Sequence, residues 1–343
     1  MSEEMKKLKK LASGIILAQG NKFIKELLRE KKIRMGATKD DFHRNMIEAI
    51  EAGKLKLTDF EEWLERVEGW GDQHVYLYKI PEEVINSALW SSEDNVRRKV
   101  EESKKLEKLW NAQTTFEYPK KLKLTGIYYK DKVISAIWHQ GVSSWLRAPS
   151  RDYEQKEDLD LYQYRAHRRR DKRTIMRFEM RLKEKMAAIF IPLPWKEADH
   201  IKAVKQVKKA LKPIIDIDSL KKANISKAIK DLDQEQLRPI NKEQSFKTQA
   251  SRLSAQGAYI EIASNTGEIF PVDIPPIKEV MLAIEPQSFT GAKGKYFFQL
   301  AGLKDEHKSF KVQLYGKERR IRFMFIMMAS EVWDILKIIG RYS

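Results

Sequence analysis

Apolar residues recur every three to four positions through much of the first 110 residues, the spacing that places them on one face of a helix. Three amphipathic helices are predicted there, with inner faces formed by Phe23, Ile24, Leu27 and Leu28, by Phe42, Met46, Ile47 and Ile50, and by Phe60, Trp63, Leu64 and Val67. Thr38 with Asp41, and Thr58 with Glu61, stand at the spacing of helix-capping pairs. Residues 74–81 predict a short strand, and 81–110 are predicted to be helical again.

From residue 114 the period shortens to two, and β-branched and aromatic residues become frequent. This pattern predicts antiparallel strands up to residue 148, with a hairpin turn at Lys130–Asp131 and breaks at Pro119 and Gly141. Residues 258–327 return to the same pattern, and SNTG at 264–267 is predicted to close a hairpin.

Helical spacing returns between these two β-rich regions. A basic helix ending before Pro192 is expected, because apolar residues stand at helical intervals: Ile175, Phe178, Leu182 and Met186. Residues 196–240 predict two lysine-rich helices broken at Pro213, and 240–257 form a polar segment expected to be a linker. The last predicted helix follows the final strands, and Ser330 can cap it.

These elements predict an α+β protein, with a helical N-terminal module followed by an α+β body of antiparallel sheets and packed helices. The expected domains are a helical module at 1–110, an α+β unit with basic helices at 111–242, and a mostly antiparallel β unit with a C-terminal helix at 243–343. A chain of 343 residues is long enough for two or three such domains.

The net charge of the chain indicates the class of its binding partner and says little about its fold. The chain has 66 Lys and Arg residues against 49 Asp and Glu, a formal net charge of +17. Such an excess favours a polyanionic partner, most commonly nucleic acid. The absence of cysteine excludes disulfides and fits a reducing compartment. No stretch has the roughly 20 apolar residues of a membrane span, so we expect no membrane partner and a cytoplasmic protein, or a nuclear one in a eukaryote.

Recognisable catalytic motifs are missing from the sequence, so no catalytic residue, cofactor or metal site is predicted. The glycine-rich segment 290–298 lacks the spacing of a phosphate-binding loop, and the six histidines include no pair at helical ligand spacing. Glu261, Glu268 and Asp273 are the candidates for a nuclease-type carboxylate cluster. Because no Glu-x-Lys pair follows them on a strand, we expect them on the solvent side of a hairpin.

The densest positive charge lies in YRAHRRRDKRTIMRFEMRL, between Tyr164 and Leu182. The planar guanidinium of arginine suits bidentate phosphate contacts, and Tyr162, Tyr164 and His167 add planar groups beside it. We predict a track of phosphate contacts formed by Arg165, Arg168, Arg169, Arg170, Lys172, Arg173, Arg177 and Arg181. The lysines of 202–212 are expected to be a solvated helix face instead.

A second candidate lies in LLREKKIRMGATKDDFHRNMIEAI, residues 27–50. An apolar helix leads through a short loop with Gly36 into a second helix that carries Lys39 and Phe42 near its start. This pattern resembles the helix–extended loop–helix module of the SAP family. The resemblance implies duplex DNA binding through the DNA backbone, with contacts from Arg34, Lys39, His43 and Arg44. The two acidic residues after Lys39 and the additional third helix depart from the family pattern.

The order of the predicted parts also resembles the centromere protein N family. The members of that family join a helical N-terminal domain to an α+β body and bind nucleosomal DNA with partner subunits. The resemblance rests on the arrangement of the elements, so it implies a fold and assigns no residue.

Three functions remain open from the sequence. The favoured one is a non-catalytic protein that binds nucleic acid, duplex DNA rather than RNA, with little sequence preference and as a subunit of a larger DNA-associated complex. The second is a metal-dependent nuclease or another enzyme that processes nucleic acid. The third is an adaptor whose basic surface binds an acidic protein.

Overall fold

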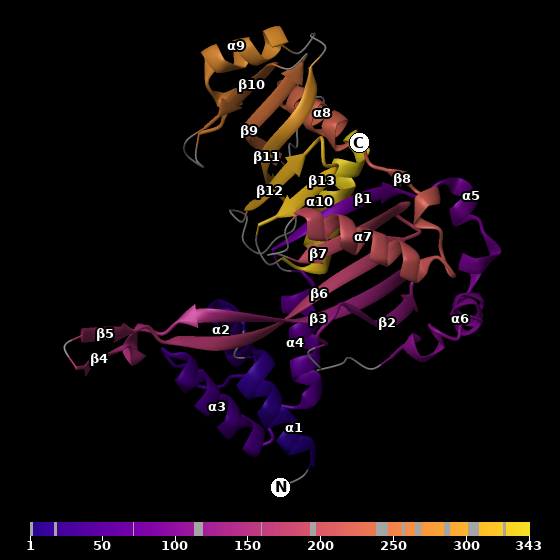
Figure 1. Cartoon of the computed structure of the whole chain (residues 1–343). Helices are drawn as coiled ribbons and strands as arrows, with labels where there is room; N and C mark the ends of the chain where they lie inside the picture. Colours follow the sequence, from indigo (N-terminus) through magenta and orange to yellow (C-terminus); the bar gives the residue numbers. More distant parts are fainter. Residues whose placement is uncertain are drawn as a thin grey trace. The chain divides into compact units, whose positions relative to one another are not determined.

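The computed structural model describes residues 3–16, 19–70, 72–112, 119–158, 160–192, 197–237, 246–255, 258–264, 269–284, 289–300, 309–324 and 327–343. The chain forms two compact units, whose elements are labelled in Figure 1. Unit 1 comprises 1–68, 113–125 and 138–175, and unit 2 comprises 69–112, 126–137 and 176–343. Each unit combines separate stretches of chain. The units therefore group residues differently from the predicted domains 1–110, 111–242 and 243–343, which stay a prediction.

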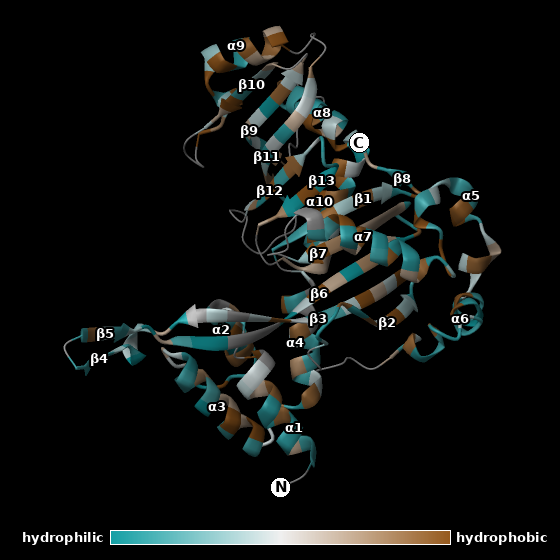
Figure 2. Ribbon diagram, in the orientation of Figure 1, coloured by the Kyte–Doolittle hydropathy of each residue, from teal (hydrophilic) through white to brown (hydrophobic). Residues whose placement is uncertain are grey.

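Unit 1 begins with the helices α1 (Glu3–Leu11), α2 (Asn21–Glu30), α3 (Lys39–Glu51) and α4 (Leu57–Gly69). Figure 2 shows α3 banded by hydrophobic and hydrophilic residues, and the apolar side chains predicted to face inward include the buried Ile24, Phe42 and Trp63. The Oγ1 of Thr38 accepts a hydrogen bond from the Asp41 amide at 3.2 Å, which confirms the predicted cap of α3. The prediction for α4 is wrong, because Thr58 lies inside the helix and the Asp59 carboxylate accepts the Lys56 amide instead.

The rest of unit 1 is a β-ribbon. It contains the distal parts of two long strands, β3 (Val133–Arg147) and β6 (His167–Arg181), and the hairpin of β4 (Tyr153–Glu157) and β5 (Asp160–Tyr164). The predicted break at Gly141 is wrong, because β3 continues through it and the Gly141 amide donates to the carbonyl oxygen of Pro119 at 2.7 Å. We call residues 143–169 the arm.

Unit 2 is a twisted, largely antiparallel sheet with helices. Its strand order is β10-β9-β11-β12-β13-β1-β7-β6-β3-β2, with β8 paired to β1. The strands not yet defined are β1 (Gln73–Lys79), β2 (Lys123–Lys130), β7 (Met186–Pro192), β8 (Lys221–Lys222), β9 (Phe246–Ala255), β10 (Ala258–Ala263), β11 (Thr290–Gln299), β12 (Ser309–Tyr315) and β13 (Arg320–Phe323). The helices are α5 (Glu82–Ile85), α6 (Glu93–Glu101), α7 (Glu197–Leu211), α8 (Ile225–Leu237), α9 (Pro275–Ile284) and α10 (Ala329–Tyr342).

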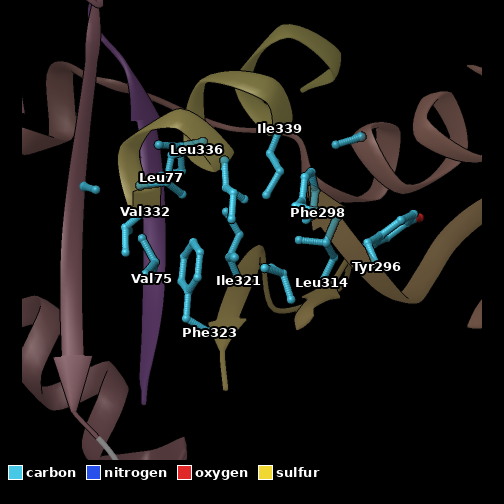
Figure 3. Packing of buried hydrophobic residues seen from close by; sticks show 14 of the residues in the cluster. Val75, Leu77, Tyr296, Phe298, Leu314, Ile321, Phe323, Val332, Leu336 and Ile339 are labelled. Atoms are coloured by element: carbon cyan, nitrogen blue, oxygen red, sulfur yellow. The ribbon is translucent and has the colours of Figure 1, made fainter. Parts of the chain in front are cut away.

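The main core of unit 2 lies between one face of this sheet and the helices α8 and α10. Alternate residues of the strands point into it, which is the period-two pattern of a half-buried sheet. Figure 3 shows side chains of β1, β11, β12 and β13 meeting those of α10, and the labelled ones are Val75, Leu77, Tyr296, Phe298, Leu314, Ile321, Phe323, Val332, Leu336 and Ile339. This alternation leaves the other side chains of the same strands on the opposite face.

The helix predicted for residues 175–186 is wrong, since this segment forms the hairpin of β6 and β7. Phe178 pairs with Ile189 and Arg181 with Met186 across a turn at Leu182–Lys185. Phe178 and Leu182 stand four positions apart, and this spacing fits both the helical period of 3.6 residues and the strand period of two. Met176, Phe178 and Met180 alternate with Arg177 and Glu179, and this alternation of apolar and charged residues marks a strand although all five are buried.

The predicted linker and the predicted SNTG hairpin are also corrected. Residues 246–255 of the expected linker form β9, which pairs with β10 in the order Ala255↔Ala258 to Ala250↔Ala263. The residues after β10 do not supply its partner: Pro271–Asp273 form a 3₁₀ turn and Pro275–Ile284 form α9. Residues 265–268 lie outside the described part of the chain. Helix α10 begins at Ala329, so Ser330 is not its cap, and the Glu331 carboxylate accepts the Met328 amide at 2.7 Å.

The prediction of an α+β protein with antiparallel sheets is confirmed. Gln73–Lys79 is a strand, as predicted. The predicted hairpin of β2 and β3 is also present, but its turn is at Asp131–Lys132, one residue later than predicted, with positive φ angles of 53° and 69°. Among the described helices, none has the length and apolar composition needed to cross a membrane.

Candidate nucleic-acid interface

The base of the arm is fixed by an arginine–aspartate pair. Arg147 forms an ion pair with Asp152 and donates to the carbonyl oxygen of Ala166 at 3.0 Å, and Asp152 accepts the Ala166 amide at 2.8 Å. The hydrogen bond from Arg147, followed by that from the Ala166 amide, lowers the pKa of Asp152 to about 2. These bonds join the chain that leaves β3 to the chain that enters β6, and they position the β4–β5 hairpin.

Cationic and aromatic side chains share the surface of the arm. Arg165, His167, Arg168 and Arg169 are exposed, and Arg169 donates to the Ser143 hydroxyl at 3.0 Å. The exposed apolar and aromatic residues are Trp145, which is 68% exposed, and Tyr153, Leu161, Tyr162 and Tyr164. Tyr153 and Tyr164 stack with ring centroids 4.7 Å apart. Exposed tryptophan beside arginine is a combination found at binding surfaces.

Charge divides the arm along its length. The exposed acidic residues lie in the β4–β5 hairpin and its turn: Glu154, Glu157, Asp158 and Asp160. The arginines lie at its base, and neither Arg165 nor Arg168 forms an ion pair with a carboxylate of the described residues. The base of the arm is therefore positively charged, whereas the hairpin is mainly negative.

Arg173 does not belong to the exposed track. Its side chain is 1% exposed and its Nη2 lies 2.5 Å from Oε2 of Glu68, itself 3% exposed. The Arg173 Nε lies 3.2 and 3.3 Å from the two Glu68 oxygens, so the contact is nearly bidentate. Burial raises the pKa of Glu68, and the charge of Arg173 opposes this shift. Arg173 is a structural ion-pair partner and cannot reach a nucleic acid in this conformation.

Arg177 and Arg181 are likewise engaged inside their unit. The Arg177 guanidinium lies 4.5 Å from the ring centroid of Trp70, and Arg177 is buried. The Arg181 guanidinium lies 4.6 Å from the ring centroid of Trp333, and its Nε is 2.6 Å from Oε1 of Glu179. These contacts are cation–π interactions that stabilise the sheet. Of the predicted track, Arg165, Arg168 and Arg169 are exposed, whereas the side chains of Arg170 and Lys172 lie outside the described part.

In the N-terminal candidate, residues 31–38 connect α2 to α3 without forming a helix or strand. Lys39 donates to the Gln19 carbonyl oxygen at 2.8 Å, and the His43 ring is hydrogen-bonded to the Ser13 hydroxyl at 2.7 Å. Both side chains therefore serve the helix packing. Arg34 and Arg44 are exposed, although Arg44 lies 2.8 Å from Asp41. Two of the four predicted contacts thus face solvent.

The candidate carboxylates do not converge in the described structure. Glu261 pairs with Arg252, and Asp273 lies 3.4 Å from Lys247. Glu268 lies outside the described residues. Among the residues that the structure describes, no group of three or more histidine and carboxylate side chains has the arrangement of a metal site.

No protein-family model matches the sequence, and no curated protein matches it. The resemblances to the SAP and centromere protein N families therefore stay proposals, and function is argued from the site itself.

Sequence reasoning named Tyr162 and Tyr164 but missed Trp145 and Tyr153 of the arm, which are also exposed, and it missed a second basic surface in unit 2. Trp145 lies in a run that alternates between polar and apolar residues, which also describes a strand with one buried face. The signal for the second surface was the alternation itself, since Lys293 and Lys295, Lys311 and Gln313, and Arg320 and Arg322 each stand two residues apart.

Proposed function

We propose that this chain is a non-catalytic nucleic-acid-binding protein that holds duplex DNA mainly through its phosphate backbone. The observation that carries the proposal is the base of the arm, where Arg165, Arg168 and Arg169 are exposed on a ribbon with Trp145. A two-stranded ribbon fits the major groove of DNA, and arginines along its sides contact phosphates. Low sequence preference follows from backbone contacts, which carry no base information.

The helical part of unit 1 supplies the second expected contact. Arg34 and Arg44 flank the start of α3, where the SAP resemblance implies backbone contacts. Lys39 and His43 keep their hydrogen bonds within the unit, so we expect them to support this surface rather than touch DNA. Protein partners in a larger complex belong to the same proposal.

The test replaces Arg165, Arg168 and Arg169 with alanine and measures binding to labelled duplex DNA at several salt concentrations. Affinity should fall for all sequences, and the slope of log affinity against log salt should flatten by up to about one for each lost phosphate contact. The matched control replaces Lys202 and Lys209 of α7 and Lys212, which directly follows that helix, with alanine, and all three are exposed. The proposal fails if the arm variant and the control bind duplex DNA with the same affinity and slope.

A variant of the hairpin checks the division of charge along the arm. Glu157→Gln together with Asp160→Asn removes two negative charges without touching the arginines. We expect duplex DNA binding to stay equal or strengthen slightly, and weaker binding would contradict contact through the base of the arm.

A further inference from the structure

The face of the unit 2 sheet that points away from α8 and α10 is strongly basic. Strands β11, β12 and β13 direct Tyr296, Val312 and Ile321 into the core, so their alternate residues lie on the other face. The cationic residues on that face are Lys247, Arg252, Lys293, Lys295, Lys311, Arg320 and Arg322. We call this surface the cationic sheet face.

Strand register arranges these residues in rows that cross the sheet. In one row Arg252 is opposite Lys293, Lys293 is opposite Tyr315, and Tyr315 is opposite Arg320. In the next row Lys295 is opposite Gln313, Gln313 is opposite Arg322, and Arg322 is opposite His74. Neighbouring strands are about 4.8 Å apart, so each row places cationic and polar groups across several strands. Gln313 and His74 of the second row are buried, and the His74 ring lies 4.6 Å from the ring of His200 in α7.

Aromatic rings lie beneath or beside the cations of the face. Lys293 and Arg320 both lie over the ring of Tyr315, at 5.5 and 4.3 Å from its centroid. Lys311 lies 5.6 Å from the centroid of Phe297, and Arg252 lies 4.4 Å from that of Tyr259, which is largely exposed. Cations held against rings lie along the sheet, so the face presents a broad surface and not projecting side chains.

Much of this positive charge is not neutralised within the protein. Among the described residues, Lys293, Lys295, Lys311 and Arg320 form no ion pair with a carboxylate. Arg252, Lys247 and Arg322 do, with Glu261, Asp273 and Asp72. Burial and the nearby charge of Lys295 lower the pKa of Lys311. Like charges on adjacent strands destabilise a sheet, so an anionic ligand would stabilise this arrangement.

The face continues toward a basic pocket. A pocket of about 760 Å³ lies beside β1, α7 and the turn between β12 and β13. Its lining includes Tyr76, Lys205, Lys208, Lys222, Lys317 and Arg319. Val75 is opposite Ile321, so Tyr76 follows at the position opposite Arg320 and joins the pocket to the first row. Glu318 also lines the pocket and Lys208 pairs with Asp218, so its charge is partly balanced.

We propose that the cationic sheet face is a second nucleic-acid site, which binds the phosphate backbone of a single strand running across β9, β11, β12 and β13 toward this pocket. A flexible single strand can follow rows on a broad surface, and sites for single strands combine basic residues with aromatic rings. A duplex meets a flat surface along a narrow line, because its major groove receives a helix or a two-stranded ribbon. The site lies in unit 2 and is independent of the proposed function of the arm.

The test compares two variants with equal loss of charge in the same unit. The first replaces Lys293, Lys295 and Lys311 with glutamine, and the control replaces Lys202, Lys209 and Lys212 with glutamine. Binding of a labelled single-stranded DNA oligonucleotide is measured across salt concentrations. The sheet-face variant should bind more weakly than the control, with a salt slope reduced by up to about 0.7 for each lost contact. Equal binding by the two variants overturns the proposal.

Further measurements separate this site from the arm and from other ligands. Duplex DNA binding should be changed no more by the sheet-face variant than by the control, and the arm variant should keep its single-strand binding. If the sheet-face variant loses duplex and single-strand binding equally, the single-strand assignment is wrong. If polyglutamate displaces the oligonucleotide as well as an unlabelled oligonucleotide of equal charge does, the nucleic-acid assignment is wrong.

Photocrosslinking of the unmodified protein to an oligonucleotide containing 5-iodouracil keeps the test independent of the folding of any variant. Adducts on peptides from 290–299 or 309–315 support the site, and adducts confined to other segments overturn it.

Discussion

Strand β6 contains two groups of arginines, which belong to the same basic segment of the sequence but differ in their exposure to solvent. Arg168 and Arg169 face solvent, whereas Arg173 and Arg177 are buried against partners from α4 and the residue that follows it. Those partners, Glu68 and Trp70, stand about a hundred positions earlier in the chain. Charge density alone therefore does not distinguish an arginine that binds a ligand from one that holds the fold. The position of a carboxylate or a ring distant in sequence decides it.

The largest expected effect concerns the buried pair. Arg173→Ala leaves the Glu68 carboxylate buried without its cation, which typically lowers the free energy of unfolding by about 3–5 kcal/mol. Urea denaturation measures this loss. The double variant Arg173→Met with Glu68→Gln should be more stable than Arg173→Ala, because no buried charge remains unpaired. A loss as small as that of an exposed arginine would contradict the structural role.

The next prediction concerns a buried carboxyl group that forms no ion pair with a cation of the described residues. Asp233 accepts hydrogen bonds from Ser251, Thr248 and Tyr296, and burial raises its pKa from 3.8 to about 6 despite them. The folded state thus holds the proton more tightly than the unfolded state. The resulting contribution to stability is complete below pH 3.8 and is lost as pH rises to about 6, by roughly 3 kcal/mol.

Asp233→Asn removes this titration. Urea titrations at each pH measure the free energy of unfolding of both proteins. The value for the variant minus that for the parent should rise between pH 4 and pH 6 and stay constant above that range. Parallel pH profiles for the two proteins would show that Asp233 does not titrate in this range.

A smaller loss is expected at Arg177. Arg177→Ala removes a guanidinium that lies 4.5 Å from the Trp70 ring centroid, and a desolvated cation–π contact contributes about 2 kcal/mol. Arg177→Lys keeps the charge but loses the planar stacking, so its unfolding free energy should lie between those of the alanine variant and the parent. Weaker DNA binding by Arg177→Ala without any loss of stability would instead return this residue to the phosphate track.

The smallest effect on stability is expected in the arm. Replacing Arg165, Arg168 and Arg169 with alanine should change the free energy of unfolding by less than about 0.5 kcal/mol, because all three are exposed. Thermal and urea unfolding should therefore coincide with those of the parent. A clear loss of stability would place these arginines in the structural group with Arg173.

Local patterns predicted the N-terminal part of the fold well. The Thr38 cap and the buried face with Phe60 and Trp63 depend on residues within one helix, so sequence spacing contains the information. The hairpin of β6 and β7 was mistaken for a helix because Phe178 and Leu182 satisfy both periods. The alternation of Met176, Phe178 and Met180 with Arg177 and Glu179 indicated a strand, but the interpretation followed the helical spacing of Ile175, Phe178, Leu182 and Met186.

The candidate site was predictable only in part. The sequence located the basic segment, but the burial of Arg173 depends on Glu68, which no local pattern connects to it. The cationic sheet face depends on register, because Arg252, Lys293 and Arg320 become neighbours only when their strands pair. Pairing between distant strands is a tertiary property, and the order β9-β11-β12-β13 is not encoded in any single segment.

Strand β1 imposes an order of events on the folding of unit 2. It lies between β7 and β13, so Gln73 pairs with Pro192 on one side and with Phe323, 250 positions further along, on the other. At about 5–20 residues per second, a ribosome needs roughly 10–50 s to make the intervening chain. Until then one edge of β1 presents unpaired amides and carbonyls, which invite association with other chains. The high contact order of this sheet makes its completion slow. A nascent chain that is halted before residue 320 exposes the unpaired edge of β1, which favours aggregation.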